Sequence, residues 1–206
     1  CVSIVLLIPM AVVAVMIIVR DPGNPFFVQK RLGRNGRELG IVKFRSMRKG
    51  ADNLEQMLTP EQLEQYQKEF KIDNDPRITR VGEFIRKASL DELPQLFNII
   101  KGDMSFIGPR PERPLFVEKF QEEIPRYMVK HQVRPGLTGW AQVNGRNTIS
   151  WEQRFEYDVY YVEHMSFLMD LKILFQTVAV VFKHNDINSA TDATMEAFTG
   201  TGKDDK

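Results

Sequence analysis

The sequence predicts an α+β protein that is mostly helical, with a small β-hairpin and an N-terminal helix that enters a membrane. Three observations lead to this fold class. The first 19 residues carry no charge, which is typical of a segment that leaves water. Residues 26–29 and 41–47 resemble strands and flank a stretch with Gly33 and Asn35-Gly36, which indicates a hairpin. Beyond residue 77, apolar residues recur at helical spacing.

Length and composition limit the classes of protein to consider. At 206 residues, the chain can bury one core of ordinary size without disulfide bonds. Its single cysteine, Cys1, excludes an internal disulfide and a metal site built from cysteines. Lysine plus arginine (28) nearly equal aspartate plus glutamate (27), so no general nucleic-acid footprint is indicated.

The N-terminal apolar segment allows three interpretations. A continuous helix of this length would reach roughly 28 Å, enough to span a bilayer core. Pro9 predicts a kink in its middle, so that the segment would dip in and return. A buried core helix is the third interpretation, since the mean hydropathy of the whole chain is −0.29. The membrane is favoured because nine basic and two acidic residues lie between positions 20 and 49, and an anionic leaflet attracts such a cluster.

The hairpin and the segments after it supply candidate cations. Strand alternation places Val42 and Phe44 on one face and Lys43 and Arg45 on the other. These two cations could bind an anion or face solvent, and the segment alone favours solvent. Residues 52–75 are acidic and predict an exposed helix or loop, while residues 78–87 predict a helix whose charged side includes Arg86.

The helix expected next carries two neighbouring carboxylates, Asp91 and Glu92. Pro94 is tolerated only in a first helical turn, so the helix should begin near Asp91. Unpaired N–H groups at that end favour an ionised carboxylate. An ionised aspartate can act as a covalent nucleophile, and an adjacent glutamate can hold a divalent cation. Ordinary capping is the alternative, because Ser89 and Glu92 match a capping box.

Further cations and polar groups favour phosphoryl transfer, which requires positioned cations, a metal and a nucleophile. Arg110 lies between Pro109 and Pro111, which would stiffen its loop for bidentate phosphate contact. A solvated arginine in a proline-rich linker is equally compatible with that segment. Residues 133–147 combine glycines that permit close backbone approach to a ligand with four candidate binding side chains: Arg134, Gln142, Asn144 and Arg146.

Other motifs in the sequence give weaker indications of a functional site. Asp73 and Asp75 resemble a glycosyltransferase metal motif but are interpreted as a polar turn before Pro76. His131, His164 and His184 lack metal-ligand spacing and are expected to be structural or solvated. Helices are predicted over residues 151–164 and 169–183. The second is apolar around most of its circumference, so it is expected to be buried or partly immersed in a lipid interface.

Several long motifs resemble the bacterial sugar transferase family, the monotopic phosphoglycosyl transferases. They are SLDELPQLFN at residues 89–98, KGDMSFIGPRP at 101–111, RPGLTGWAQVNGR at 134–146 and KFRSM at 43–47. The resemblance covers nearly the whole chain. It implies a re-entrant helix over residues 1–22, broken near Pro9, then a catalytic domain over 23–185 with amphipathic interfacial helices. The composition of the residues predicts a loose polar tail over 186–206.

The same resemblance implies the chemistry and its partners. Asp91 would attack the β-phosphate of a UDP-sugar, releasing UMP, and polyprenol phosphate would then collect the phosphosugar. Glu92 would coordinate Mg²⁺, and Arg86 and Arg110 would lie near phosphate groups. The enzyme, a phosphotransferase, would act at the cytoplasmic face of the bacterial inner membrane, in contact with membrane lipids, in the first membrane step of a surface-glycan pathway. The sugar, the polyprenol length, the pathway and any homo-oligomer stay open.

Two alternatives from other classes stay open. One is a direct glycosyltransferase that uses Asp73 and Asp75 and releases UDP. The other is a non-catalytic membrane scaffold, in which the basic cluster binds anionic lipids and the two carboxylates only cap a helix.

Overall fold

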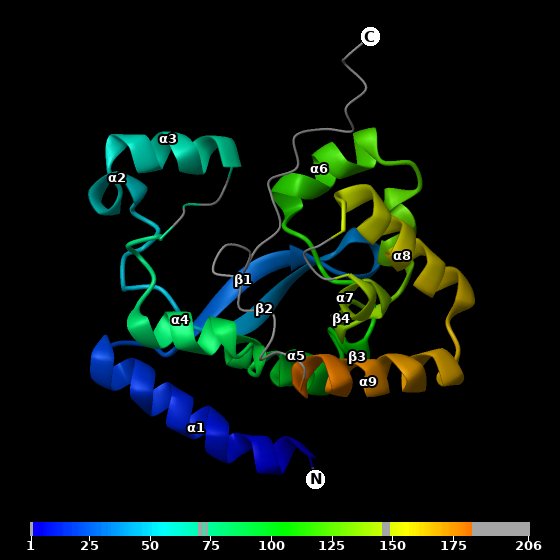
Figure 1. Ribbon diagram of the computed structural model, residues 1–206, viewed down its shortest axis with the longest axis horizontal. Helices are drawn as coiled ribbons and strands as arrows, with labels where there is room; N and C mark the ends of the chain where they lie inside the picture. The colour runs from blue at the N-terminus through cyan, green and yellow to red at the C-terminus, as the bar shows by residue number, and fades with distance from the viewer. Residues whose placement is uncertain (1, 70–71, 73, 146–148, 183–206) are drawn as a thin grey trace. The chain divides into compact units, whose positions relative to one another are not determined.

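The computed structural model describes residues 2–69, 72, 74–145 and 149–182. The chain divides into two compact units (Figure 1). The first comprises residues up to 29 together with 42–97, and the second comprises 30–41 and the described residues from 98 onward. The tail expected over residues 186–206 lies outside the described residues.

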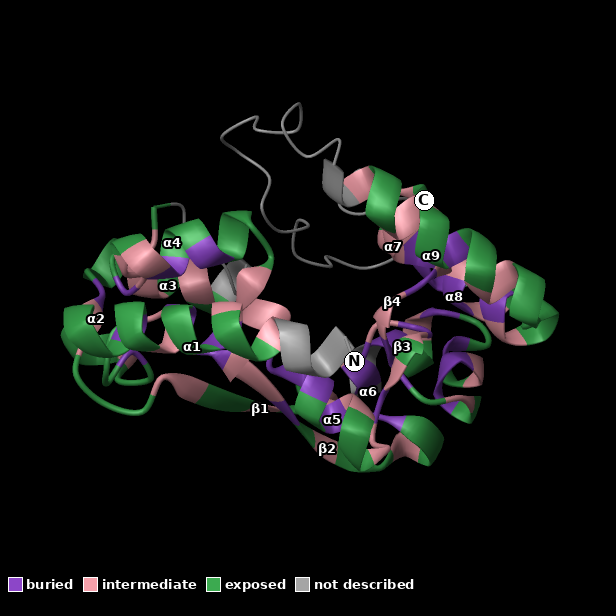
Figure 2. Ribbon diagram, turned by 90° about the horizontal axis from the view of Figure 1, so that it is seen from below, coloured by how far each residue is buried: buried purple, intermediate pink, exposed green. Residues whose placement is uncertain are grey.

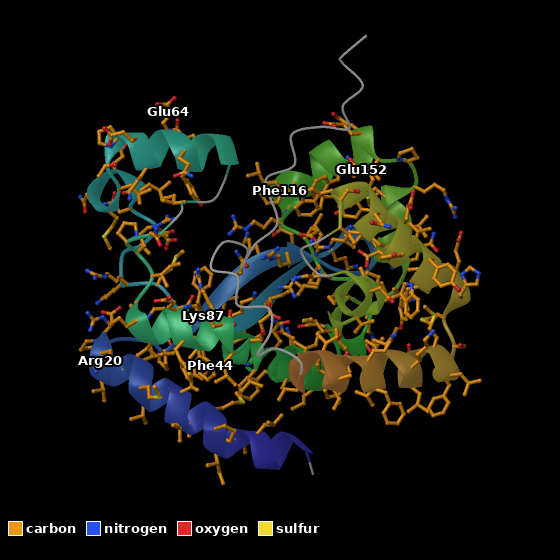
Figure 3. The ribbon with its side chains drawn as sticks, viewed as in Figure 1. Arg20, Phe44, Glu64, Lys87, Phe116 and Glu152 are labelled. Carbon is orange, nitrogen blue, oxygen red and sulfur yellow. The ribbon has the colours of Figure 1, made fainter. Side chains whose placement is uncertain are left out.

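The first unit begins with helix α1 (Val2–Arg20), which packs against α4 (Arg80–Lys87). Met10, Val13 and Ile17 are buried side chains of this helix, and their spacing of three and four residues defines one helix face. The neighbouring positions Ile8, Val15 and Val19 are exposed, and Arg20 closes the last turn (Figure 3). Of the helices formed by described residues, none combines the length and apolarity needed to cross a membrane.

The break expected near Pro9 is wrong at the level of secondary structure, because α1 continues through that residue. A proline removes one backbone hydrogen bond from a helix, which can bend the helix without ending it. The membrane topology of this segment therefore stays a prediction.

The expected hairpin is present. Strand β1 (Phe26–Leu32) pairs with β2 (Glu38–Phe44) through a short 3-10 turn, η1 (Arg34–Gly36). Asn35 and Gly36 both adopt positive φ, 58° and 69°, which is the reason an Asn-Gly pair suits this turn. Phe44 stacks on Phe26 at 5.4 Å between ring centroids, which anchors the ends of the strands.

The acidic stretch forms two short helices, α2 (Leu54–Met57) and α3 (Pro60–Glu69), and α4 follows. Thr79 caps α4 by accepting a hydrogen bond from the Gly82 amide. The helix expected to begin near Asp91 instead begins at Gln95: residues Leu90–Glu92 form a 3-10 turn, η2, and α5 covers Gln95–Lys101. Gly102, with φ of 88°, ends α5 as expected.

The second unit is built around two short parallel strands, β3 (Ser105–Ile107) and β4 (Gly136–Thr138), which the sequence did not predict. Gly108 and Gly136 lie so close together that a Cβ added to Gly136 would come within 2.1 Å of the Gly108 nitrogen. A Cβ on Gly139 would likewise meet the Gly108 oxygen at 2.2 Å. These glycines therefore allow two backbone segments to pack closely against each other.

Helices α6 (Pro114–Glu123), α7 (Trp140–Asn144), α8 (Trp151–His164) and α9 (Phe167–Phe182), with the 3-10 segment η3 (Tyr127–Gln132), complete this unit. Its core is aromatic: the rings of Phe120, Tyr127 and Phe155 lie 4.8 to 5.4 Å apart, centroid to centroid. Helix α8 has the predicted bounds, and α9 begins two residues earlier than predicted. Most of α9 is exposed (Figure 2), including Phe167, Leu168 and Phe175.

Candidate functional site

The two candidate catalytic carboxylates lie on η2, between α4 and α5. Ser89 precedes this turn in the left-handed conformation, with φ of 54°, and Leu93 closes it with a backbone hydrogen bond to Leu90. Ser89 makes no side-chain capping bond, so the capping-box alternative is wrong. Asp91 and Glu92 are both half-buried, and the sharp turn sets them apart from the α-helices on either side.

Lys43 joins this pair of carboxylates from strand β2. Its Nζ donates to Glu92 Oε1 at 2.9 Å, and both side chains are only 17 % exposed. The interpretation of Lys43 as a solvated strand residue is therefore wrong. A charge-assisted hydrogen bond that is largely shielded from water is stronger than a surface ion pair, so this contact ties the hairpin to the carboxylates.

Arg86 reaches the same region from α4. Its guanidinium donates to Ser46 Oγ at 2.8 Å, which fixes the group beside the loop that follows β2. Partial loss of hydration lowers the pKa of Arg86, while the charges of Asp91 and Asp75 act to raise it. Arginine stays protonated at any physiological pH, so Arg86 supplies a permanent positive charge within electrostatic range of Asp91.

Arg45 lies elsewhere in the first unit. Its guanidinium contacts both the backbone oxygen and, at 3.6 Å, the carboxylate of Asp21, in the turn that ends α1. The sequence predicted that Arg45 and Phe44 face opposite sides of the strand. Strand β2 ends at Phe44, however, and the chain then turns toward Asp21. This contact gives Arg45 a structural role at the end of α1.

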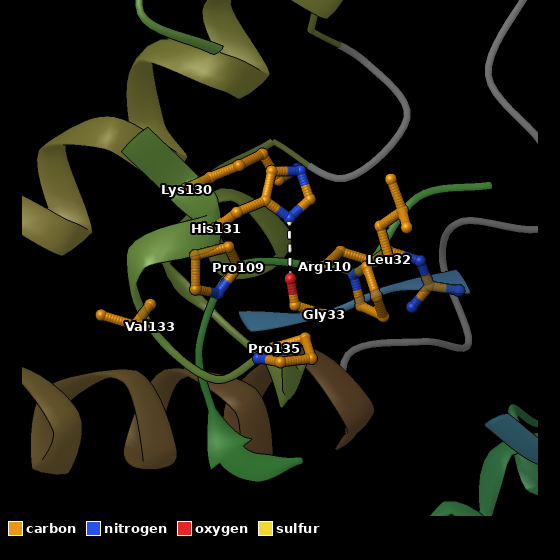
Figure 4. A pocket seen from close by; sticks show the side chains of 9 residues that line it. Leu32, Gly33, Pro109, Arg110, Lys130, His131, Val133 and Pro135 are labelled. Carbon is orange, nitrogen blue, oxygen red and sulfur yellow. Dashed lines mark hydrogen bonds between the residues drawn. The ribbon is translucent and has the colours of Figure 1, made fainter. Parts of the chain in front are cut away.

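The second unit holds Arg110 in a firmly braced loop. Pro109 accepts a hydrogen bond from the Gly136 amide at 3.0 Å, and the carbonyl of Glu112 accepts one from the Leu32 amide at 2.9 Å. Arg110 lines a small pocket together with Lys130 and His131 (Figure 4). The stiffness expected from the two flanking prolines is thus reinforced by contacts on both sides of the loop.

Buried ion pairs support this loop, and the sequence did not predict them. Arg154 Nη2 lies 2.9 Å from Glu112 Oε1, and Lys130 Nζ lies 2.6 Å from Asp158 Oδ2. Burial raises the pKa of Glu112, but the neighbouring cations, Arg154 first among them, outweigh it, so the pKa is lowered overall. Glu112 is consequently ionised at neutral pH. Its place directly after the Pro-Arg-Pro motif was the only signal available in the sequence.

The remaining candidates of the second unit differ in their surroundings. Gln142 is half-buried, and no group of the described residues pairs with its side-chain amide atoms. Asn144 is exposed and donates to the Trp140 carbonyl at 2.8 Å. Arg134 is exposed. Arg146 lies outside the described residues.

Asp75 and His131 each have a partner within their own part of the fold. Asp75 is engaged by Arg77, with Nη2 to Oδ2 at 2.6 Å, which agrees with a structural turn, whereas Asp73 lies outside the described residues. His131 is buried, and its Nδ1 donates to the Gly33 carbonyl at 3.2 Å (Figure 4). Nowhere in the described ranges do three or more potential metal-ligating residues gather.

Comparison with known proteins identifies the family. Residues 1–184 match the bacterial sugar transferases. The chain belongs to the bacterial sugar transferase family. The expectation drawn from its motifs is therefore confirmed, and with it the enzyme class, a phosphotransferase.

Several members of the bacterial sugar transferase family are close in sequence. The uncharacterized sugar transferase EpsL of Bacillus subtilis is 42 % identical over 98 % of this chain and 90 % of its own length. The UDP-galactose-lipid carrier transferase of Erwinia amylovora is 43 % identical over 88 % of this chain. The UDP-glucose:undecaprenyl-phosphate glucose-1-phosphate transferase of Escherichia coli is 40 % identical over 81 % of this chain. The chain spans only 38 % and 34 % of those last two proteins.

Proposed function

We propose that this protein transfers a sugar 1-phosphate from a UDP-sugar to undecaprenol phosphate or a similar polyprenol phosphate, with Asp91 as covalent nucleophile. The observation that carries the proposal is the arrangement on η2. Asp91 lies in the field of Arg86, and its neighbour Glu92 is held by Lys43 at 2.9 Å. Relatives named as undecaprenyl-phosphate sugar phosphotransferases support the choice of substrates.

The reaction has two steps. In the first, a carboxylate oxygen of Asp91 attacks the β-phosphorus of the UDP-sugar. The bond from that phosphorus to the oxygen bridging the two phosphates breaks, and UMP leaves. In the second, a phosphate oxygen of the polyprenol phosphate attacks the same phosphorus and displaces Asp91. The product is a polyprenyl diphosphate sugar, and the carboxylate is regenerated.

The first unit contributes charge and position to both steps. Arg86 offsets negative charge as it develops on the phosphoryl oxygens. Lys43 holds Glu92 on the turn and lowers the electrostatic cost of placing two carboxylates beside an anionic substrate. We propose Arg110 of the second unit as a further phosphate contact, with Gln142, Asn144 and Arg146 as candidate substrate contacts.

The carboxylate of Glu92 suits Mg²⁺ as a donor. Magnesium prefers hard oxygen ligands and commonly takes one or two carboxylates, with substrate phosphates and water completing its shell. We propose that Glu92 holds the ion, which when bound would neutralise charge on the diphosphate. One carboxylate together with substrate phosphates and water is sufficient for such a site, so a larger acidic cluster is not required.

The proposal is tested with the full chain and a UDP-sugar in the absence of lipid acceptor. We expect release of UMP in an amount close to that of enzyme, because the covalent intermediate cannot turn over. Asp91→Asn should abolish the release, and Asp52→Asn, at an exposed aspartate of the same unit, should leave it unchanged. A phosphosugar adduct at another residue, or release that survives Asp91→Asn, would contradict the proposal.

The same assay separates the alternatives. A direct glycosyltransferase would release UDP instead of UMP, and a scaffold would release neither. The ion pair between Asp75 and Arg77 disfavours the glycosyltransferase, since it occupies a carboxylate that such a metal site would need. A panel of UDP-sugars in this assay identifies the preferred sugar. We place the reaction at the cytoplasmic face of the bacterial inner membrane, where nucleotide sugars are available.

A further inference from the structure

The second unit contains a cavity of about 280 Å³ in addition to the pocket at Arg110. Its polar wall includes Arg34 from η1 and Arg134 from the segment before β4, and its apolar wall includes Ile107, Val133 and Met165. A space of this size approaches the lower limit of known small-molecule sites, roughly 300 Å³. The cavity can therefore hold a polar head group but not a whole nucleotide sugar.

The charges around this cavity favour an anion. Among the described residues that line it, Asp170 is the one acidic residue, and its carboxylate accepts a hydrogen bond from Tyr161 Oη at 2.8 Å. Burial raises the pKa of Tyr161, so the phenol keeps the proton that it donates. Two guanidinium groups against one carboxylate leave a net positive charge. An anion would lie at the arginines, which bind phosphate through paired N–H groups.

The cavity opens beside apolar surface. Met165 lines it and is itself 54 % exposed, and Phe167 and Leu168, which follow at the start of α9, are 79 % and 75 % exposed. Exposed apolar side chains continue along the helix at Leu171, Leu174 and Phe175. A free inorganic phosphate would gain no binding free energy from these apolar side chains. An anion that carries an acyl chain would gain binding free energy by burying the chain against them.

We propose that this cavity binds the phosphate of an anionic membrane phospholipid, with Arg34 and Arg134 on the head group and the acyl chain along the exposed side of α9. Such a site is separate from the catalytic role proposed for Asp91. It would hold the second unit at the bilayer by a specific head group in addition to general hydrophobic contact.

The test uses the full chain and co-sedimentation with phosphatidylcholine vesicles, with and without phosphatidylglycerol. We expect phosphatidylglycerol to strengthen binding, and we call the ratio of binding with and without it the selectivity. The variant Arg34→Gln/Arg134→Gln should reduce this selectivity by at least about fivefold, which is the usual contribution of one cation near a membrane surface. The matched control is Arg37→Gln/Arg126→Gln, which removes two exposed arginines that do not line the cavity. An equal loss in the control would mean general electrostatic attraction and would overturn the proposal.

Two further arms identify the ligand. Met165→Trp changes no charge but narrows the mouth of the cavity, so it should lower the selectivity for phosphatidylglycerol; unchanged selectivity would overturn the proposed cavity.

In the second arm, phosphatidylglycerol is replaced by polyprenol phosphate, or inorganic phosphate is added in large excess. Stronger selectivity for polyprenol phosphate would assign the cavity to the acceptor substrate, and full competition by inorganic phosphate would assign it to a free anion. Either result would overturn the phospholipid assignment, whereas UMP release by the same variants reports on the catalytic proposal independently.

Discussion

At the scale of single residues, Lys43 illustrates how distant positions complete a site. It lies 49 positions before Glu92 in the chain, yet the two side chains form a shielded ion pair at 2.9 Å. The alternation of side chains along the strand predicted that Lys43 and Phe44 lie on opposite faces. No local rule could identify Glu92 as the partner of Lys43. The contact forms because the end of β2, from Val42 onward, and η2 belong to the same compact unit.

Removing this cation should affect catalysis more than folding. We expect Lys43→Met to lower UMP release by roughly tenfold to a hundredfold, since Glu92 loses its partner and the site loses positive charge. The matched control is Lys30→Met, whose ion pair with Glu38 is exposed and contributes at most about 1 kcal/mol. UMP release by Lys43→Met at the wild-type level would show that the pair is only structural.

His131 predicts a dependence of stability on pH. Burial and the charge of Lys130 lower the pKa of His131 to about 4, despite opposing effects of the Gly33 carbonyl and Glu112. An unfolded chain binds this proton near pH 6.5, so the contribution to stability is complete above that pH and is lost as the pH falls from 6.5 toward 4.

The variant His131→Asn tests this prediction, because asparagine keeps an N–H that can reach the Gly33 carbonyl. Between pH 7 and pH 5, the unfolding free energy of the wild type should fall by about 2 kcal/mol more than that of the variant. This difference follows from the lower pKa of His131 in the folded than in the unfolded state. Urea titrations at the two pH values measure the difference. Parallel losses in both proteins would mean that His131 is not the group responsible.

At the scale of elements, α4 positions Arg86 through close backbone packing. Gly82 is buried where a Cβ would lie 1.8 Å from the Ser46 carbonyl oxygen, and Ser46 is also the hydrogen-bond partner of Arg86. The sequence predicted this helix from its apolar spacing. It contained no signal that the glycine marks the contact with the segment after β2.

We expect Gly82→Ala to destabilise the protein by about 1–3 kcal/mol, as overpacking usually does, and to reduce UMP release, because α4 must move away from Ser46. Lys87→Ala in the same helix is the control. Lys87 is exposed (Figure 3) and pairs with Glu83 across one turn, so its loss should cost a few tenths of a kcal/mol. A variant at Gly82 with wild-type thermal stability would contradict the packing argument.

At the scale of the whole molecule, family membership and exposed apolar surface both indicate association with membranes. Relatives are named for reactions on undecaprenyl phosphate, a membrane lipid. Helices α1 and α9 each expose several large apolar side chains, which exceeds what scattered surface residues on a soluble protein would explain.

This association should resist salt. We expect the chain to stay with the membrane fraction in about 1 M salt, where charge attraction is screened within roughly 3 Å, and to be released by detergent. Phe167→Glu/Phe175→Glu on α9 should weaken binding to uncharged vesicles, whereas Glu83→Gln on α4 should not. Release of the wild type by salt alone would show that its attachment is mainly electrostatic.

The sequence by itself determined the family, the α+β class and the hairpin, because these depend on local patterns and on long ordered motifs. It also determined the bounds of α8, whose start follows a capping serine. The 3-10 turn under Asp91, the partners of Lys43 and Arg45, the buried pairs at Glu112 and Lys130, and the parallel strands β3 and β4 were decided only by the tertiary structure. All of these except the turn join segments far apart in the chain, and such contacts depend on which surfaces exclude water together, a property that no local stretch of sequence specifies.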